Sequence, residues 1–237
     1  MKHAQLSKTL MEGLDLSHPP VAMSFLSELP SGIPHFSEIV PSACTFWRRA
    51  EVRVFYAKAE DHYTCPVGAM TMGFELPAEN KKEAEKLFGE MLRLQYLSEK
   101  EFPEIPSVKK PHDVVVYGPL AEFPVSPDVV LMIVLPGQAM ILSEATSASS
   151  WTGPALTLLG RPTCGVIPSA LDRQTAVTSA ACIGARIYAD LREEELVMVV
   201  PGGRLDELSN KLQGALLANK ALSDYHTAKK RKLSDIC

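Results

Sequence analysis

Several familiar catalytic signatures are absent from this chain of 237 residues. It contains no phosphate-binding G-x-x-x-x-G-K-S/T loop, no G-x-G-x-x-G dinucleotide fingerprint, no H-E-x-x-H zinc helix and no G-x-S-x-G nucleophile elbow. These absences argue against nucleotide-driven chemistry, against a zinc metalloprotease of that type and against a serine hydrolase.

Long apolar segments are missing as well. The longest uninterrupted apolar run, residues 129–135, is far shorter than the roughly 20 residues that a membrane-spanning helix needs. The first residues, MKHAQL, carry no apolar signal segment. We therefore expect a soluble, cytoplasmic protein with no membrane partner.

Basic charge is not in excess. The formal net charge is -4 at pH 7, and acidic and basic residues are mixed along the chain. One basic cluster, residues 229–232 (KKRK), lies in the polar C-terminal tail, where cations favour the end of a helix. We expect no nucleic-acid partner.

Apolar periodicity predicts alternating helices and strands. One-sided apolar patterns predict helices over residues 2–14, 79–98 and 205–222. Short apolar runs predict strands at residues 21–25, 114–117, 129–134 and 196–200. With 46% hydrophobic residues the chain can bury a proper core. We predict an α/β or α+β fold, with a mixed β-sheet and helices packed on it.

Residues 100–113 are rich in proline and charge, and they are the best candidate for a sub-domain boundary within a single domain of residues 1–237. A division there leaves one pair of cysteines on each side. Two interpretations of this repeated pair of cysteines stay open. One is an internal pseudo-duplication, and the other is chance, because the two halves share little beyond the cysteine segments.

Four of the five cysteines form two pairs of similar spacing. Cys44 precedes Cys65 by 21 residues, and Cys164 precedes Cys182 by 18, whereas Cys237 is the last residue of the chain. In a reducing compartment we expect such thiols to be free, catalytic or metal-bound rather than joined in disulfides. Four thiols are the number that completes an iron–sulfur cluster or a zinc site.

The downstream cysteine of each pair precedes small residues, in CPVGA (residues 65–69) and CIGA (residues 182–185). Small residues allow a close approach of the backbone, and a helix that begins there would direct its free N–H groups at the sulfur. Both effects favour a thiolate, which serves as a metal ligand or a nucleophile. Ordinary packing of a free cysteine is the alternative for any one of them.

Spacing alone does not define a cluster site here, because no C-x-x-C occurs. The absence of C-x-x-C-H also excludes covalent c-type haem, although haem held by a single ligand stays open.

His62 lies three residues before Cys65 and directly after Asp61. A histidine so close to a cysteine could ligate a metal, donate a proton or act as the base that activates Cys65. Asp61 could orient its ring. The structural alternative is that this Asp-His pair ends a strand or caps a helix.

The cysteine-bearing segments resemble the uncharacterised family DUF169. The resemblance lies in residues 43–50 (ACTFWRRA), 55–56 (FY), 60–69 (EDHYTCPVGA), 160–165 (GRPTCG), 181–186 (ACIGAR) and 199–203 (VVPGG), so it covers nearly the whole chain. It implies a protein type that is common in anaerobic bacteria and archaea, and it implies no settled activity, substrate or cofactor.

We hypothesise a metallocofactor or redox protein that binds an iron–sulfur cluster, with 4Fe–4S favoured, through Cys44, Cys65, Cys164 and Cys182. Its partner would be a redox protein or a small-molecule substrate, and a homo-oligomer is compatible with the sequence. The first alternative is a metal-free redox or transferase enzyme that uses Cys65 and His62. The second alternative is a non-enzymatic accessory protein that binds haem or another ligand.

Overall fold

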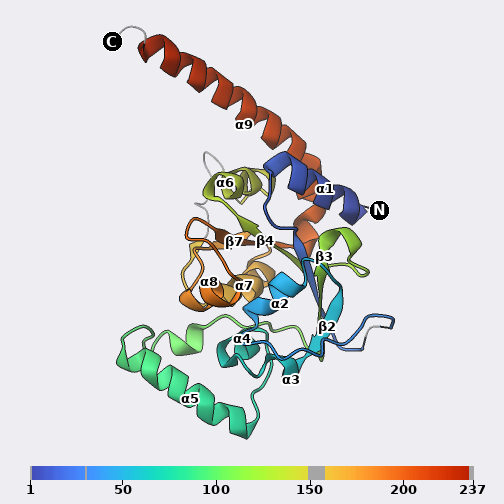
Figure 1. The fold of residues 1–237 in the computed structure, drawn as a ribbon, viewed down its shortest axis with the longest axis vertical. Coiled ribbons are helices and arrows are strands. Elements are labelled where there is room, and N and C mark those ends of the chain that lie inside the picture. Colours follow the sequence, from blue (N-terminus) through green and yellow to red (C-terminus); the bar gives the residue numbers. More distant parts are fainter. Residues whose placement is uncertain (1, 30, 149–157, 235–237) are drawn as a thin grey trace.

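The chain folds into one mixed β-sheet that is covered by helices on both faces (Figure 1). The structure is a computed structural model, and it describes residues 2–29, 31–148 and 158–234. Within these ranges the strands are β1 (Val21–Leu26), β2 (Phe55–Lys58), β3 (Val114–Pro119), β4 (Val129–Val134), β5 (Leu158–Leu159), β6 (Val177–Ser179) and β7 (Leu196–Pro201). The α-helices are α1 (Lys2–Leu14), α2 (Cys44–Arg49), α3 (Ala59–His62), α4 (Pro66–Thr71), α5 (Ala78–Arg93), α6 (Pro136–Ala145), α7 (Val166–Arg173), α8 (Ile183–Tyr188) and α9 (Leu205–Ser234). The 3₁₀ turns are η1 (Phe102–Glu104), η2 (Leu120–Glu122), η3 (Thr163–Gly165) and η4 (Gly202–Arg204).

The sheet order among the described strands is β2-β3-β1-β4-β7-β6-β5. Neighbouring strands run antiparallel, except that β5 and β6 run parallel. The central strands β3 and β4 are buried along their whole length, as their uninterrupted apolar sequences predict. The expectation of a mixed sheet with helices packed on it is confirmed, and the fold is α+β.

Alternation along the strands divides the interior into two cores. On one face, Val116, Val130 and Met198 pack with the leucines of α1 and α9 and with α6. On the other face, Tyr117, Leu131 and further apolar residues pack with α2, α4, α5, α7 and α8. Because successive side chains of a strand point to opposite faces, each strand serves both cores. Buried Cys44 and Cys164 belong to the second core, which we call the cysteine face.

The strand pairing follows a pseudo-twofold symmetry. Six residue pairs join β1 to β3, from Val21↔Pro119 onwards, and six join β4 to β7, from Val129↔Pro201 onwards. Directly after each terminal proline, the next N–H donates to the carbonyl just before the partner strand: Leu120 N to Pro20 O at 2.8 Å, and Gly202 N to Asp128 O at 2.7 Å.

The symmetry continues at the centre and outwards. Strands β1 and β4 pair antiparallel, and the pairing is centred on Ala22↔Val130. The pseudo-twofold rotation that relates the two strand pairs therefore also exchanges β1 with β4. In the outer pairs, Phe55↔Tyr117 of β2 and β3 matches Val177↔Val199 of β6 and β7. We call residues 2–122 the first half and residues 129–234 the second half. A duplication would produce this register, although the pseudo-duplication of the sequence itself stays a prediction.

Residues 100–113 remain our predicted sub-domain boundary. Strand β3, which follows this segment, pairs with β1 and β2, which precede it, so the strand pairing crosses the predicted boundary.

Two of the three predicted helices differ from the observed ones at their C-terminal ends, whereas the helix predicted over residues 2–14 forms there as α1. Helix α5 ends at Arg93 rather than near residue 98, because Gln95 adopts the left-handed conformation, with φ 55°, that terminates helices. Helix α9 continues to Ser234 instead of ending near residue 222, because no glycine or proline interrupts its second half, which extends away from the body (Figure 1). None of the helices in the described ranges combines the length and the apolar character that crossing a bilayer requires.

Candidate functional site

Each of the four paired cysteines lies at the start of a helical segment on the cysteine face. Cys44 is the first residue of α2, and Cys164 lies in η3, which leads into α7. Cys65 and Cys182 are the residues directly before α4 and α8. A helix therefore begins directly after each downstream cysteine. Cys237 lies outside the described residues.

Gly68 explains how α4 fits against the first pair. A Cβ atom at this position would lie 2.5 Å from Ala43 Cβ and 3.0 Å from Cys65 Sγ, so any side chain would push α4 away from the residue before Cys44. Gly184 has no such constraint, since its nearest neighbour would be 3.9 Å away. The predicted close approach of the backbone therefore holds for the first Gly-Ala segment and not for the second.

The four thiols are near enough to affect one another. Burial raises the pKa of the Cys44 thiol well above its usual range, and negative charge on Cys164, Cys65 or Cys182 would raise it further, while a hydrogen bond with Ser42 lowers it. The two pairs, which are about a hundred residues apart in the sequence, share one apolar core, in which Cys44 and Cys164 are buried and against which Cys65 and Cys182 pack.

Cys164 experiences the same surroundings. Burial raises its pKa to about 12, with further contributions from Cys65 and Cys182, and a hydrogen bond with Thr71 of α4 opposes the shift. Each half supplies one buried thiol, Cys44 or Cys164, and one partly exposed thiol, Cys65 or Cys182.

A hydroxyl residue just before each upstream cysteine contacts the downstream cysteine of the same pair. Ser42 Oγ donates to Cys65 Sγ at 3.5 Å. In the second half, Thr163 Oγ1 accepts from the Cys182 backbone N–H at 2.6 Å. These two bonds fasten together segments that are 23 and 19 residues apart. The sequence contained this signal, because a hydroxyl residue stands one or two positions before both upstream cysteines, but we did not predict it.

His62 is fully buried, and both of its ring nitrogens have partners other than Cys65. Nδ1 lies 2.7 Å from the Lys58 carbonyl oxygen, so Nδ1 carries the proton and donates it. Nε2 then accepts from the Tyr117 hydroxyl at 3.0 Å. Burial lowers the pKa of His62 to about 4, which keeps the ring neutral near pH 7. Asp61 Oδ2 accepts from the Lys58 backbone N–H at 2.7 Å and lies 2.8 Å from His35 Nε2. Asp61 is therefore engaged with groups other than the His62 ring, and the arrangement favours a structural role for the Asp-His pair.

Tyr117 is a site residue that the sequence did not single out. Burial raises the pKa of its hydroxyl far above the usual range, and the proximity of Cys164 and Cys44 adds to this shift. Tyr117 therefore contacts the buried His62 and shares one apolar core with Cys44 and Cys164. In the sequence it was one apolar residue of a predicted strand, and nothing local distinguished it.

The cysteine set does not have the geometry of a site for one metal ion. No group of three or more His, Cys, Asp or Glu side chains in the described part of the chain is arranged to hold a single ion. A tetrahedral zinc site requires all four sulfurs at about 2.3 Å from one point.

The chain belongs to the family DUF169, described as an uncharacterised ArCR family, which matches residues 9–211. It is also similar to the uncharacterised protein MJ0308 of Methanocaldococcus jannaschii, with 26% identity over 217 residues that cover 87% of this chain and 92% of that protein. No solved structure matched the chain. These relatives identify the family and assign no activity.

Proposed function

We propose that the protein binds an iron–sulfur cluster of the 4Fe–4S type, held by Cys44, Cys65, Cys164 and Cys182. The observation that carries the proposal is that all four cysteines belong to or pack against one apolar core, and that α2, which begins at Cys44, contacts α8, which begins after Cys182, through the bond from Thr45 Oγ1 to the Tyr188 carbonyl at 3.2 Å. Four cysteine thiolates are the usual ligands of such a cluster, which supplies one-electron chemistry when bound.

The surroundings of the thiols support this proposal. Cys44 and Cys164 are only 6% and 5% exposed and belong to an apolar core, which would shield a cluster from water. The Ser42 hydroxyl donates to Cys65 Sγ at 3.5 Å, and hydrogen bonds to ligand sulfurs are one way in which proteins adjust a cluster's reduction potential.

Anaerobic purification and reconstitution test the proposal directly. We expect the full chain to take up about four irons and four sulfides and to develop the visible absorption of thiolate-ligated iron. Replacing any one of the four paired cysteines with serine should reduce this uptake strongly. The matched control is Cys237→Ser, which should load like the wild type.

Two results would overturn the proposal. One is a reconstituted chain that stays colourless and free of iron. The other is unchanged iron content in all four single variants.

A metal-free thiol enzyme is the second candidate, because Cys65 is partly exposed and accepts a hydrogen bond from Ser42. His62 supports it less well, since both ring nitrogens are engaged by Lys58 and Tyr117. If no iron binds, alkylation of Cys65 and substitution of His62 become the next tests. The proposed electron partner or small-molecule substrate, and the accessory protein that binds haem, stay predictions.

A further inference from the structure

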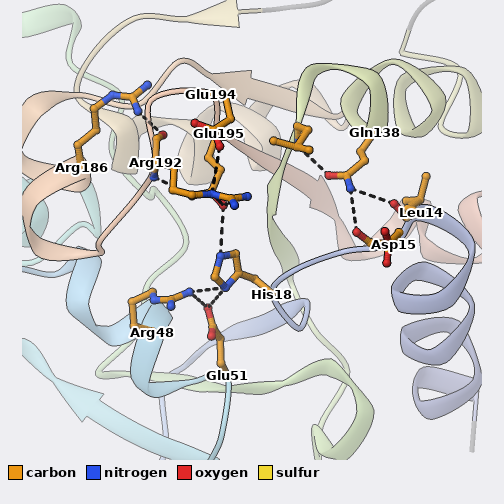
Figure 2. Close-up of polar contacts among 11 residues, drawn as sticks. Leu14, Asp15, His18, Arg48, Glu51, Gln138, Arg186, Arg192, Glu194 and Glu195 are labelled. Atoms are coloured by element: carbon orange, nitrogen blue, oxygen red, sulfur yellow. Dashed lines mark hydrogen bonds and ion pairs between the residues drawn. The ribbon is translucent and has the colours of Figure 1, made fainter.

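The ionic cluster around His18 joins the two halves, and its charges are paired with one another (Figure 2). Arg48 of α2 pairs with Glu51, and Arg192 pairs with Glu195 at 2.9 Å in the turn before β7. His18 lies between the two pairs, with Nε2 3.4 Å from Glu195 Oε1. Because these groups already have partners, the cluster is a structural junction and offers a ligand little to bind.

An open cavity of about 860 Å³ has a different composition. Its floor consists of buried apolar side chains from the core of the cysteine face, among them Phe74, Ala84, Phe88 and Val108. Phe102 adds a ring that meets Phe88 edge to face, with the ring centroids 4.7 Å apart. Pockets that hold small molecules have volumes of about 300–1,000 Å³ and mostly apolar, aromatic walls, so this cavity fits that class.

The lining residues of the cavity all come from one stretch of chain, residues 70–109. This stretch runs from the end of α4 through α5 and η1 towards β3. In the second half α8 leads into β7 within a few residues, and the same strand register forms without such a stretch. The strand pairing therefore does not require the cavity, which favours a role for it in binding.

The charges at the mouth of the cavity balance. Its exposed lining residues include two lysines and two glutamates, Lys81, Lys109, Glu75 and Glu85. Lys109 is also engaged outside the cavity, because its Nζ lies 2.9 Å from Asp172 Oδ2 of α7. Such a mouth favours an ion of neither sign, and the apolar floor disfavours a buried charge. The occupant that fits this arrangement is an uncharged molecule.

The cavity shares helix α4 with the cysteine site. Cys65 directly precedes α4, and Met70, near the other end of that helix, lines the cavity. The Val108 N–H donates to the Thr71 carbonyl at 2.9 Å, which fastens another wall of the cavity to α4. A molecule bound there would therefore lie against the helix that begins after Cys65.

We propose that this cavity binds an uncharged, largely aromatic small molecule, which packs against Phe74, Phe88 and Phe102 and leaves any polar group at the charged mouth. This binding site goes beyond the proposed function and does not depend on it, because none of the lining residues is a cysteine. It can therefore be tested on the cofactor-free chain, whether or not a cluster binds.

Fluorescence titration of the full chain with N-phenyl-1-naphthylamine is the direct test, because this probe is aromatic and uncharged. We expect saturable binding of one equivalent. Ala84→Leu places a larger side chain in the floor of the cavity and should weaken binding about tenfold or more. The matched control is Ala78→Leu, the same substitution at the exposed first residue of α5, outside the cavity, which should bind like the wild type.

A charged form of the probe tests the class of ligand. 8-Anilino-1-naphthalenesulfonate has the same rings and an added sulfonate, and we expect it to bind no more tightly than the uncharged probe. Tighter binding of the sulfonate would overturn the assignment to an uncharged ligand. No saturable binding of the uncharged probe, or equal binding by Ala84→Leu and the wild type, would overturn the site itself.

Methyl signals locate the bound probe in the wild type, so this measurement does not depend on the folding of a variant. The methyl of Met70, which lines the cavity, should shift when the uncharged probe is added. The methyl of Met140, exposed on α6 at the other face of the sheet, should not. A titration that leaves Met70 unshifted would contradict the proposal.

Discussion

The two halves of the sheet share their strand register but differ in what surrounds it. Both halves pair six residues of a central strand with six of its neighbour, and both place a hydroxyl residue against the downstream cysteine. The first half alone contains the buried pair of His62 and Tyr117, because the position equivalent to Tyr117 is Val199.

The first half also contains a long insertion, residues 72–113, whereas α8 leads into β7 within a few residues. This insertion carries α5 and borders an open cavity of about 860 Å³, lined by Phe74, Phe88 and Phe102 among others. The halves share the strand register and the short helical segments at the cysteines. They differ in the residues around the cysteines, since only the first half has the insertion that lines the cavity.

The largest expected loss of stability comes from replacing Gly202, directly after β7, where the two halves differ. A Cβ atom on Gly202 would lie 1.8 Å from the Pro127 carbonyl oxygen, whereas the equivalent position in the first half accommodates the buried Leu120. Gly202→Ala must displace backbone, and it should cost about 4 kcal/mol of unfolding free energy in urea titrations. The matched control is Gly203→Ala, whose Cβ would make an ordinary contact at 3.5 Å with Gln174 and should cost little. Equal losses in both variants would contradict this prediction.

The next effect is sensitivity of the first half to acid. The pKa of His62 is about 4 in the folded chain, below its usual value near 6.5, because burial disfavours the charged ring. Between these values the unfolded chain binds a proton that the folded chain does not, so stability is present above pH 6.5 and is lost as the pH falls. The loss from this group between pH 7 and pH 4 should be about 3 kcal/mol.

Urea titrations at pH 7, 5.5 and 4 measure that loss. His62→Gln should be less stable at pH 7 and should show a shallower dependence on pH. Hydrogen exchange at pH 4.5 should be faster in β2 and β3 than in β6 and β7. A variant with the same slope as the wild type would remove His62 as the cause.

The sequence predicted those parts of the fold whose signal is long and local. The leucine spacing of α1 and the apolar runs of β4 and β7 are such signals, and these elements form where expected. The outer strands β2 and β6 have four and three residues, too few for periodicity to distinguish them from loops, so they were missed.

The site was less predictable than the fold. Helices after Cys65 and Cys182 could be inferred from their small neighbours, but the approach of the two pairs depends on β1 pairing with β4 at the centre of the sheet. That is a contact between distant segments. Tyr117 could not be recognised for the same reason, because its partner His62 is 55 residues away.

Loss of the hydroxyl link in the second half should have a moderate effect. Thr163 is fully buried, and its Oγ1 accepts from the Cys182 N–H at 2.6 Å. Thr163→Val keeps the shape of the side chain and removes this acceptor, which should cost about 2 kcal/mol because a backbone donor loses its partner. Thermal or urea unfolding of the cofactor-free chain measures it. A neutral variant would show that water or another group can replace the hydroxyl.

The smallest effect should come from the corresponding link in the first half. Ser42 Oγ lies 3.5 Å from Cys65 Sγ and 3.4 Å from the Cys44 nitrogen, so both contacts are long, and a thiol is a weak acceptor. Ser42→Ala should therefore cost only about 0.5 kcal/mol, the lower end for a net hydrogen bond. Ser37→Ala, at an exposed position nearby, serves as the control and should be neutral. If Ser42→Ala were as costly as Thr163→Val, the two hydroxyls would contribute equally to stability despite their different geometry. A smaller cost for Ser42→Ala, which we expect, would show that the hydroxyl contributes less to stability in the first half than in the second. The position of α4 beside Cys44 would then depend more on the packing of Gly68 against Ala43.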